Sequence, residues 1–408
     1  MGKYLNLYYK PTEEDLICKF YIEPNKISFE KCAEQLAAES SIGTWTEVKT
    51  MNKRIEKMSA KVFEINKKNR IVKIAYPIIL FERANISQIM SSIAGNIFGM
   101  KTIKNLRLLD VEIPKVMIKS FKGPAIGLED IRRIMKIKDF PIIGTIFKPK
   151  LGLTPKEMTK LAYKIYSAGV DYTKDDENLA SMEFNRFEER VIRILDVVDK
   201  IKREQGRQVI YSPNITSQAD KMLERAEFVK KQGGKCIMID IITCGWSSLQ
   251  FIVEKTRKMK PIIHAHRAGH AIFTRNKKHG ISMLVIAKFA RLAGVSALHT
   301  GTVVGKMEGK KSEVVEINNF LRSSMQGIKK VMPIASGGLH PKLVPQIIKI
   351  LGSDLIINFG GGLWGHPLGP EAGAKAIRQA IEATIKGIPL EEYAKNKKEL
   401  KIALKTWK

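Results

Sequence analysis

The stretch Pro141-Ile-Ile-Gly-Thr-Ile-Phe-Lys-Pro-Lys150 joins a short apolar run to a pair of lysines. A run of this length without polar alternation is typical of a parallel strand that is covered on both faces. Seven more runs follow toward the C-terminus, and amphipathic helical segments separate them. The eight runs cover residues 142–147, 170–173, 209–212, 236–240, 261–264, 297–299, 332–335 and 355–359.

The number of runs decides the fold class. Eight strand–helix units in about 250 residues are what a (β/α)8 barrel requires, whereas a doubly wound sheet usually has about five to seven strands. A helical stretch at residues 28–38 and strand-like stretches at residues 60–65 and 71–76 precede the runs. We therefore predict an α/β protein in which a smaller α+β, ferredoxin-like domain at residues 1–122 precedes a (β/α)8 TIM barrel with a C-terminal helical tail at residues 123–408.

The chain is strongly basic, with 70 Lys and Arg against 41 Asp and Glu and a formal net charge of +29. Such a charge suits a nucleic-acid binder, an enzyme for polyanionic substrates, or a lysine-rich surface without a ligand. The lysines are spread along the whole chain, without an arginine patch interleaved with aromatic residues, which argues against nucleic acid as a partner. A basic protein that binds another polyanion is the alternative.

Composition also restricts the class of protein. An apolar content of 44% excludes an intrinsically disordered chain. No apolar run reaches the roughly 18 residues that a membrane span needs, and the N-terminus lacks the hydrophobic core of a signal peptide. Four scattered cysteines without a C-x-x-C pair indicate reduced thiols. We therefore expect a cytoplasmic protein without a membrane partner.

Chemically reactive residues cluster where the predicted strands end. Barrel enzymes build their active sites at the carboxyl ends of the strands, so these residues should converge on one cavity. The candidates are Lys148 and Lys150 after the first run, Lys174, Asp176 and Glu177 after the second, His266 and Arg267 after the fifth, His299 after the sixth, Ser336, Gly337 and Gly338 after the seventh, and Gly360 and Gly361 after the eighth.

Two of these groups predict metal binding and proton transfer. Lys174 and Asp176 share a face if the strand's period of two continues, and hard carboxylate oxygens select Mg²⁺ over Zn²⁺. Two neighbouring ammonium groups, Lys148 and Lys150, would lower each other's pKa, which makes a lysine usable as an acid or base near neutral pH. An exposed run of charges is the alternative for both groups.

Two glycine-rich loops predict phosphate binding. Glycines allow backbone N–H groups to approach phosphate oxygens, and the loops after strands seven and eight are the usual phosphate site of this fold. The guanidinium of Arg267, together with His299, suits a second anion. A bisphosphate that spans the barrel mouth is therefore our hypothesis.

A further segment has the composition of a hinged lid. Gly301-Thr-Val-Val-Gly-Lys-Met-Glu-Gly309 is bounded by glycines and carries Lys306 at its tip, where a closing loop would exclude water from a substrate. A plain connecting loop is the alternative. His266 and His270 likewise have an ordinary alternative, as a hydrogen-bonded pair at the start of a helix.

As a set, these motifs resemble the large subunit of ribulose-1,5-bisphosphate carboxylase/oxygenase (RuBisCO), from about residue 37 to residue 394. The phrasing of residues 93–100 and 187–190 is most similar to the archaeal form III branch, with form II/III as the neighbouring possibility. The matching motifs are the stretches around Lys148, Lys174, His266 and Lys306 in the predicted barrel, and Glu39-Ser-Ser-Ile-Gly-Thr-Trp45 and Gly95-Asn-Ile-Phe-Gly99 in the first domain.

The resemblance implies Mg²⁺-dependent carboxylation of D-ribulose 1,5-bisphosphate with CO₂ to two molecules of 3-phosphoglycerate, with oxygenation by O₂ as a side reaction. It implies that Lys174 is carbamylated by an activating CO₂ and holds Mg²⁺ together with Asp176 and Glu177. The carbamate would remove the C3 proton of the substrate. Lys148, supported by Lys150, would act in later proton transfers and protonate the final carbanion.

The other site residues are also assigned by resemblance. Lys306 would stabilise the new carboxylate, and His266 would assist at C3. Glu39 would pair with Lys306 of a neighbouring subunit, which implies a homodimer with shared active sites that can assemble further and needs no small subunit. The substrate-binding set would be Lys150, Arg267, His299, Ser336, Gly337, Gly338, Gly360 and Gly361, with Glu39, Thr44, Trp45 and Asn96 from the neighbouring subunit.

The chain departs from the family pattern at two places. Gly269 stands where most members carry Met, and residues 309–331 form a shorter connection than usual, which would affect lid closure or CO₂/O₂ discrimination. A RuBisCO-like enolase or isomerase of a sugar phosphate is the alternative within the fold, although such relatives replace several residues that are all present here. The form III likeness implies a role in AMP and nucleotide salvage.

Overall fold

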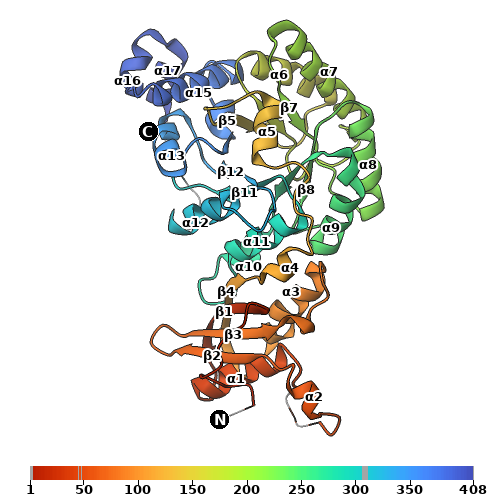
Figure 1. The fold of residues 1–408 in the computed structure, drawn as a ribbon. Coiled ribbons are helices and arrows are strands. Elements are labelled where there is room, and N and C mark those ends of the chain that lie inside the picture. Colours follow the sequence, from red (N-terminus) through yellow and green to blue (C-terminus); the bar gives the residue numbers. More distant parts are fainter. Residues whose placement is uncertain (1–2, 45, 47, 306–310, 408) are drawn as a thin grey trace. The chain divides into compact units, whose positions relative to one another are not determined.

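The computed structural model describes residues 3–44, 46, 48–305 and 311–407. The predicted site residues Trp45 and Lys306 lie outside this part of the chain. Figure 1 follows the fold from the red N-terminus to the blue C-terminus. The chain forms two compact units, of which the first contains Met1–Lys122, Gly269–Ala293 and Met325–Gly327, and the second contains Gly123–Ala268, Gly294–Ser324 and Ile328–Lys408.

The first unit is built on a five-stranded sheet with the strand order β10-β4-β1-β3-β2. β1 (Asp15–Pro24) pairs antiparallel with both β3 (Ile71–Pro77) and β4 (Ile103–Glu112). β2 (Lys61–Asn66) continues the sheet antiparallel to β3, and the short β10 (Gly280–Ile281) pairs parallel with β4. A largely antiparallel sheet with helices confirms the α+β prediction for this part of the chain.

Local sequence explains the central elements of this unit. Every second residue of β1 is buried from Leu16 to Ile22, which is the period of a strand with one covered face. α1 (Phe29–Glu39) begins at Ser28, whose side chain accepts from the backbone N–H of Lys31. The other helices are α2 (Lys53–Glu56), η1 (Ile78–Leu80), α3 (Ile86–Ala94), η2 (Asn96–Gly99), α4 (Lys115–Ile118), α10 (His270–Thr274) and α11 (Met283–Ala293).

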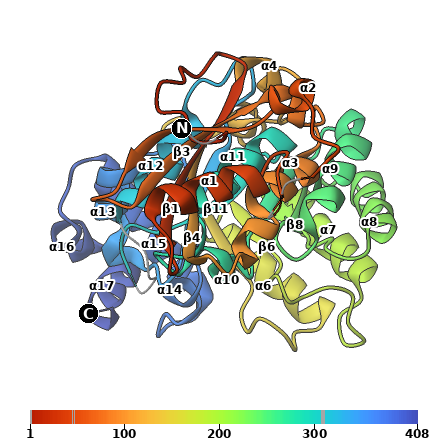
Figure 2. The same ribbon diagram turned by 90° about the horizontal axis from the view of Figure 1, so that it is seen from below.

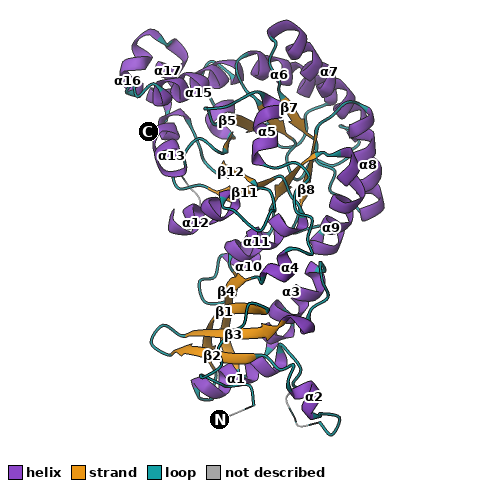
Figure 3. Ribbon diagram, in the orientation of Figure 1, coloured by secondary structure: helices purple, strands orange, loops and turns teal. Residues whose placement is uncertain are grey.

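The second unit contains an eight-stranded parallel sheet, ordered β7-β6-β5-β13-β12-β11-β9-β8. A parallel bridge between Asn214 and Met238 joins the β7 end of this order to β8 and closes the ring. This arrangement, coloured orange in Figure 3, confirms the predicted barrel. The strands are β5 (Ile142–Ile146), β6 (Tyr172–Lys174), β7 (Ile210–Ser212), β8 (Cys236–Asp240), β9 (Ile262–His266), β11 (Ala297–Gly301), β12 (Met332–Ser336) and β13 (Ile356–Phe359).

Helices cover the outside of the barrel, as the labels α7, α8 and α9 show in Figures 1 and 2. The first of them, α6, starts with Thr154, Pro155 and Glu157, which form a capping box with proline at the first helical position. None of the helices in the described part of the chain has the length and apolar character that crossing a bilayer requires. The helices are α6 (Pro155–Ser167), α7 (Phe187–Gln205), α8 (Ala219–Lys231), α9 (Gly245–Thr256), η3 (Arg257–Met259), α12 (Lys311–Arg322), η4 (Pro341–Leu343), α13 (Val344–Leu351), α14 (Gly361–Trp364), α15 (Pro370–Ile385), α16 (Leu390–Tyr393), η5 (Ala394–Asn396) and α17 (Lys398–Thr406).

An apolar plug fills the amino-terminal end of the barrel. α5 (Leu128–Met135) contributes Leu128, Ile131 and Met135, and these side chains pack against the first residues of the strands. Because this end of the barrel is filled with hydrocarbon, polar chemistry is confined to the opposite end. The strand residues in the cluster are Ile142, Tyr172, Ile210, Cys236, Ile262, Ala297, Met332, Ile334 and Ile356.

Candidate active site

Lys174 is the last residue of β6, and its side chain is fully buried. Its Nζ donates to the carbonyl oxygen of Asp175 at 2.8 Å and to Oε2 of Glu177 at 3.2 Å. Burial lowers the pKa of Lys174, although the negative charge of Glu177 opposes that shift. A lowered pKa increases the fraction of neutral amine, which is the nucleophilic form of a lysine.

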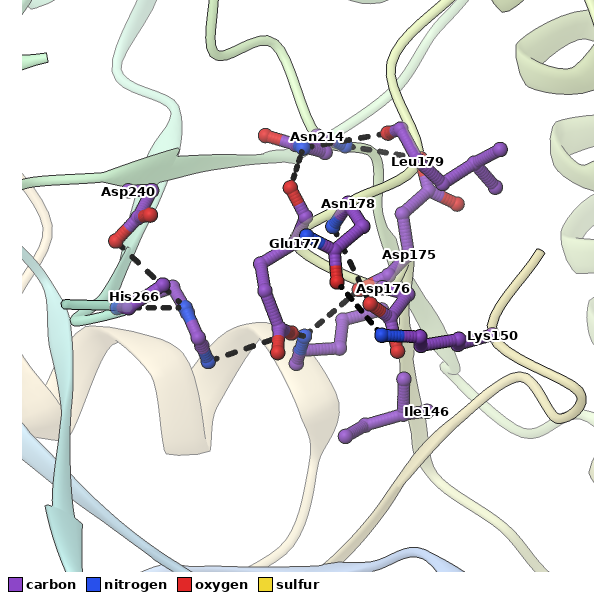
Figure 4. Close-up of polar contacts among 12 residues, drawn as sticks. Ile146, Lys150, Asp175, Asp176, Glu177, Asn178, Leu179, Asn214, Asp240 and His266 are labelled. Atoms are coloured by element: carbon purple, nitrogen blue, oxygen red, sulfur yellow. Dashed lines mark hydrogen bonds and ion pairs between the residues drawn. The ribbon is translucent and has the colours of Figure 1, made fainter. Parts of the chain in front are cut away.

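Two carboxylates lie beside this amine at the end of β6. Oδ2 of the buried Asp176 accepts from Nζ of Lys148 at 2.9 Å. Burial alone would raise the pKa of Glu177, but the positive charge of Lys174, together with the hydrogen bonds from Lys174 and the backbone, outweighs it and lowers the pKa to about 2. Lys150 reaches the same loop through Oδ1 of Asn178 at 3.3 Å, and Figure 4 shows these side chains gathered together.

His266, the last residue of β9, faces the same cluster from the other side. Its Nε2 lies 3.4 Å from Oε2 of Glu177, and its Nδ1 lies 3.7 Å from Oδ1 of Asp240, as Figure 4 shows. Nδ1 also accepts the backbone N–H of Ala268 at 3.2 Å. In the neutral ring, an acceptor at Nδ1 leaves the proton on Nε2, so His266 presents a donor toward Glu177.

The donor set fits Mg²⁺ only when Lys174 takes part. Asp176 and Glu177 supply two hard oxygen donors, which suit Mg²⁺. Among the described residues, no three His, Cys, Asp or Glu side chains form a metal site by themselves. Addition of CO₂ to the amine of Lys174 would convert a cation into a third oxygen donor next to Glu177.

A buried network that the sequence reasoning missed holds the loop that carries these carboxylates. Oδ1 of Asp175 accepts from the hydroxyl of Tyr211 at 2.6 Å. Oδ2 accepts from Nε of Arg190 at 3.1 Å and from the backbone N–H of Asn214 at 2.9 Å. Nδ2 of Asn214 in turn donates to the carbonyl oxygen of Glu177 at 3.1 Å. The period of two would have placed Asp175 on the face opposite to its neighbours, but no local pattern identifies its partners.

Arg267 and Gly301 approach each other closely at the ends of β9 and β11. Burial lowers the pKa of Arg267 to about 10, so the guanidinium is cationic at neutral pH. A Cβ atom added to Gly301 would lie 2.9 Å from Nη2 of Arg267, and Gly301 has a φ of +92°. The glycine therefore leaves the space that the guanidinium occupies.

His299 of β11 and Ser336 of β12 are both predicted site residues, and the structure brings them together on neighbouring strands. Nδ1 of His299 lies 2.9 Å from Oγ of Ser336, and its Nε2 lies 2.8 Å from Nε2 of His264. Both ring nitrogens of His299 thus have partners inside the protein. His264 and its neighbour Tyr172, whose hydroxyl lies 2.7 Å from Nδ1 of His264, were not among the predicted residues.

The two glycine loops follow β12 and β13. Gly337 and Gly338 have φ values of +115° and +65°, which only glycine adopts without strain. A Cβ atom on Gly360 or Gly361 would meet nothing within 4 Å, so this backbone faces open space. The loop after β13 therefore leaves its backbone accessible, as phosphate binding requires, and in the loop after β12 Gly338 is exposed and Gly337 half-buried.

Three predicted residues belong to the first unit. Glu39 ends α1, Thr44 lies in the turn that follows, and Asn96 begins η2. A Cβ atom on Gly43 would lie 2.6 Å from the hydroxyl oxygen of Tyr4, so the turn before Thr44 is tightly packed.

Comparisons with known proteins agree with this geometry. Residues 127–407 match the family model "Ribulose bisphosphate carboxylase large chain, catalytic domain", and residues 3–117 match the model of its N-terminal domain. A ribulose bisphosphate carboxylase from Pyrococcus abyssi is 50% identical over 406 residues, covering 99% of this chain and 96% of the relative. One from Methanocaldococcus jannaschii is 48% identical over 427 residues, covering 99% of this chain and 100% of the relative.

Solved structures show the same fold. The octameric RuBisCO from Pyrococcus horikoshii OT3 superposes with a TM-score of 0.96 at 48% identity, covering 99% of this chain and 96% of that one. The dimeric archaeal RuBisCO from Hyperthermus butylicus superposes with a TM-score of 0.93 at 43% identity, covering 99% and 98%. Since both family models and whole-length relatives match, the chain belongs to the RuBisCO large chain family.

Proposed function

We propose that this chain catalyses the Mg²⁺-dependent carboxylation of D-ribulose 1,5-bisphosphate to two molecules of 3-phosphoglycerate, with oxygenation by O₂ as a side reaction. One observation carries the proposal: a buried lysine amine lies within 3.2 Å of a carboxylate at the carboxyl end of a barrel strand. Lys148 and His266 contact the two carboxylates beside this amine from other strands. The relatives from Pyrococcus abyssi and Methanocaldococcus jannaschii are ribulose bisphosphate carboxylases, which supports this reaction.

Activation begins at Lys174. Its neutral amine attacks CO₂, a nitrogen–carbon bond forms, and the nitrogen loses a proton to leave a carbamate anion. The carbamate, Asp176 and Glu177 would then hold Mg²⁺, which supplies positive charge for the developing enediolate oxygens. A free carbamate oxygen would take the C3 proton of the bisphosphate.

Other residues complete the proton transfers. The ammonium of Lys148, held by Asp176, would protonate the carbanion left after cleavage of the carbon–carbon bond. Lys150 would support it from Asn178, and the Nε2 proton of His266 would assist at C3. Lys306 would stabilise the new carboxylate.

The substrate phosphates would bind at two ends of the site. Arg267 and His299 would serve one phosphate, and Gly337, Gly338, Gly360 and Gly361 the other, with Ser336 on a sugar hydroxyl. Glu39, Thr44, Trp45 and Asn96 would come from a second copy of the chain. The dimeric and octameric archaeal relatives support a homodimer with shared sites.

Incorporation of labelled CO₂ tests the proposal. After preincubation with CO₂ and Mg²⁺, the protein should convert ribulose bisphosphate and ¹⁴CO₂ into acid-stable product. Lys174→Ala and Lys174→Arg should both abolish the product, since arginine keeps the charge but cannot form the carbamate. Exchange of the C3 proton with solvent without ¹⁴C incorporation would instead indicate an enolase or isomerase, and no reaction at all would contradict both functions.

We further propose that the activity serves AMP and nucleotide salvage in the cytoplasm. The likeness to archaeal RuBisCO structures supports this role. Cell extracts should convert ribose-labelled AMP into labelled 3-phosphoglycerate, and removal of this chain should stop that conversion.

A further inference from the structure

A chain of hydrogen bonds crosses the interior of the barrel between β6 and β12. The hydroxyl of Tyr172 lies 2.7 Å from Nδ1 of His264, Nε2 of His264 lies 2.8 Å from Nε2 of His299, and Nδ1 of His299 lies 2.9 Å from Oγ of Ser336. The first three side chains are at most 2% exposed, and Ser336 is partly exposed. The chain therefore runs from the dry core to the glycine loop after β12.

The two imidazoles in this chain are neutral. Burial lowers the pKa of His264 and of His299 well below the ordinary range for histidine. A neutral imidazole has one N–H donor and one nitrogen acceptor. The nitrogen-to-nitrogen contact then needs one donor and one acceptor, so every hydrogen bond in the chain points in the same direction.

Tyr172 decides which direction that is. Its hydroxyl lies 2.7 Å from Nδ1 of His264 and 3.2 Å from Sγ of Cys236, and it also interacts with the hydroxyl of Ser212, so Nδ1 of His264 is the nearer of the two measured partners. An imidazole nitrogen is a strong acceptor and a thiol sulfur is a weak one, so the phenol donates to His264. The thiol proton of Cys236 has its own acceptor in Oγ of Ser212 at 3.2 Å.

The other bonds follow from this first one. His264 carries its proton on Nε2 and donates it to Nε2 of His299. His299 then carries its proton on Nδ1 and donates it to Ser336. The hydroxyl proton of Ser336 is left free to point at a ligand. In the opposite direction Ser336 would donate to His299 and could only accept from a ligand.

We propose that Tyr172 and His264 are positioning residues that fix the Nδ1–H tautomer of His299 and thereby make Ser336 a hydrogen-bond donor to an oxygen of the sugar phosphate. The assignment of a sugar phosphate as the ligand rests on the proposed function. The direction of the hydrogen bonds does not depend on it. His299, which the proposed function places beside a substrate phosphate, would in addition position the hydroxyl of Ser336.

Neutron diffraction from the deuterated protein tests the direction without any substrate. We expect deuterons on Nε2 of His264 and on Nδ1 of His299, with the phenolic deuteron of Tyr172 directed at His264. A deuteron on Nδ1 of His264 would overturn the proposal, whatever reaction the protein catalyses. If the protein fixes no CO₂, only the assignment of a sugar phosphate as the ligand is contradicted, and the direction of the hydrogen bonds is still tested by the deuteron positions.

Steady-state kinetics test the consequence for the substrate. Tyr172→Phe keeps the ring and removes one hydroxyl, and the KM for ribulose bisphosphate should rise about fivefold, the value of one neutral hydrogen bond. The kcat should stay within about twofold, because the lost interaction is with the bound substrate and not with the transition state alone. A fall in kcat at constant KM would contradict the proposal.

A matched control and a double variant separate positioning from general damage. Tyr166 is an equally buried tyrosine whose hydroxyl bonds Thr173 and the carbonyl oxygen of Ile210, outside the chain. Tyr166→Phe should leave KM within about twofold. Ser336→Ala should raise KM, and adding Tyr172→Phe to it should cause no further rise, since the hydroxyl that Tyr172 directs is already absent. Independent, multiplying effects would overturn the proposal.

Discussion

The two ends of the barrel share eight strands and differ in almost everything else. At the amino-terminal end, α5 seals the first residues of the strands with an apolar cluster. At the carboxyl-terminal end, Glu177 contacts both Lys174 and His266. The same framework therefore carries the candidate reactive side chains at one end of the strands and an apolar cluster at the other.

The three-residue strand β6 shows this contrast most sharply, since a buried aspartate stands at each end. Asp171 precedes the strand and accepts from Nη2 of Arg207 at 2.8 Å and from Nη2 of Arg378 at 2.7 Å. Asp175 follows the strand and accepts from Arg190 and Tyr211. Both are aspartate–arginine clusters around a buried aspartate, but Arg190 is fully buried whereas Arg207 and Arg378 are about a quarter exposed. Burial of an ion pair thus does not identify a functional role, whereas the loop attached to it does.

The largest expected effect on activity comes from removing the negative charge of Asp175. Asp175→Asn removes the negative charge that holds Arg190 and loosens the loop of Asp176 and Glu177. Carboxylase activity should fall by about 10- to 100-fold, the usual effect of losing a partner behind a metal ligand. Retention of full activity would show that the loop of Asp176 and Glu177 does not depend on the charge of Asp175.

Asp171→Asn is the matched control at the other end of β6. Breaking a buried pair costs about 3–5 kcal/mol, so chemical denaturation should show a loss of this size in Asp175→Asn. The loss in Asp171→Asn should be smaller, because its arginine partners are about a quarter exposed. Activity of folded Asp171→Asn should stay within about twofold of the unmodified protein. An equal loss of activity in both variants would contradict the claim that only the Asp175 cluster supports the active site.

The apolar plug predicts an effect on stability alone. Ile131 of α5 is completely buried in the cluster at the amino-terminal end. Ile131→Ala should lower the free energy of unfolding by about 2–5 kcal/mol through lost burial and a cavity. The kcat measured below the melting temperature should not change. A fall in kcat under those conditions would mean that the plug acts on the chemistry.

Two glycines with positive φ values test the anion site. Gly301→Ala places a Cβ atom 2.9 Å from Nη2 of Arg267, so the guanidinium must shift, whereas Gly206, with a φ of +67°, has open space around it. Both substitutions should cost about 1 kcal/mol in stability. Only Gly301→Ala should raise the KM for the bisphosphate, by about tenfold if one charged hydrogen bond is lost. Equal KM values in the two variants would contradict a role for Arg267 in substrate binding.

The smallest effect lies outside both ends, in the first unit. Hydrogen bonds from Tyr21 and Asn105 outweigh the burial of Glu23 and, with Lys278, lower its pKa from 4.5 to about 2. A carboxyl group with a lowered folded-state pKa stabilises above its unfolded pKa, and this contribution is lost as pH falls from about 4.5 to 2. Glu23→Gln should therefore flatten the fall in stability in this window. An unchanged pH dependence of unfolding would contradict the pKa shift.

Much of the second unit was predictable because its signal is local. Each parallel strand is a short apolar run, and the residues after it share one end of the barrel. Lys174, Asp176 and Glu177 are close in sequence, so their proximity needed little tertiary information. Lys148 joined them because its strand β5 pairs directly with β6.

The missed features depend on contacts between distant residues. Asp175 meets Arg190, Tyr211 and Asn214 only after β6 and β7 pair and α7 packs behind them. The link from Tyr172 to His264 crosses the barrel interior. β1 escaped prediction although its buried positions alternate. Residues 269–293 join the first unit through the pairing of β10 with β4, for which the sequence has no local signal. Gly269 adopts a φ of +82° there, a conformation that a methionine would strain.

The central claim is that the amine at the end of β6 binds CO₂. Protein labelled with ¹⁵N-lysine and incubated with ¹³CO₂ and Mg²⁺ should give one carbamate ¹³C signal coupled to ¹⁵N. This signal should be absent from Lys174→Arg and present in Asp171→Asn. A coupled signal that survives in Lys174→Arg, or no coupled signal in the unmodified protein, would contradict the account.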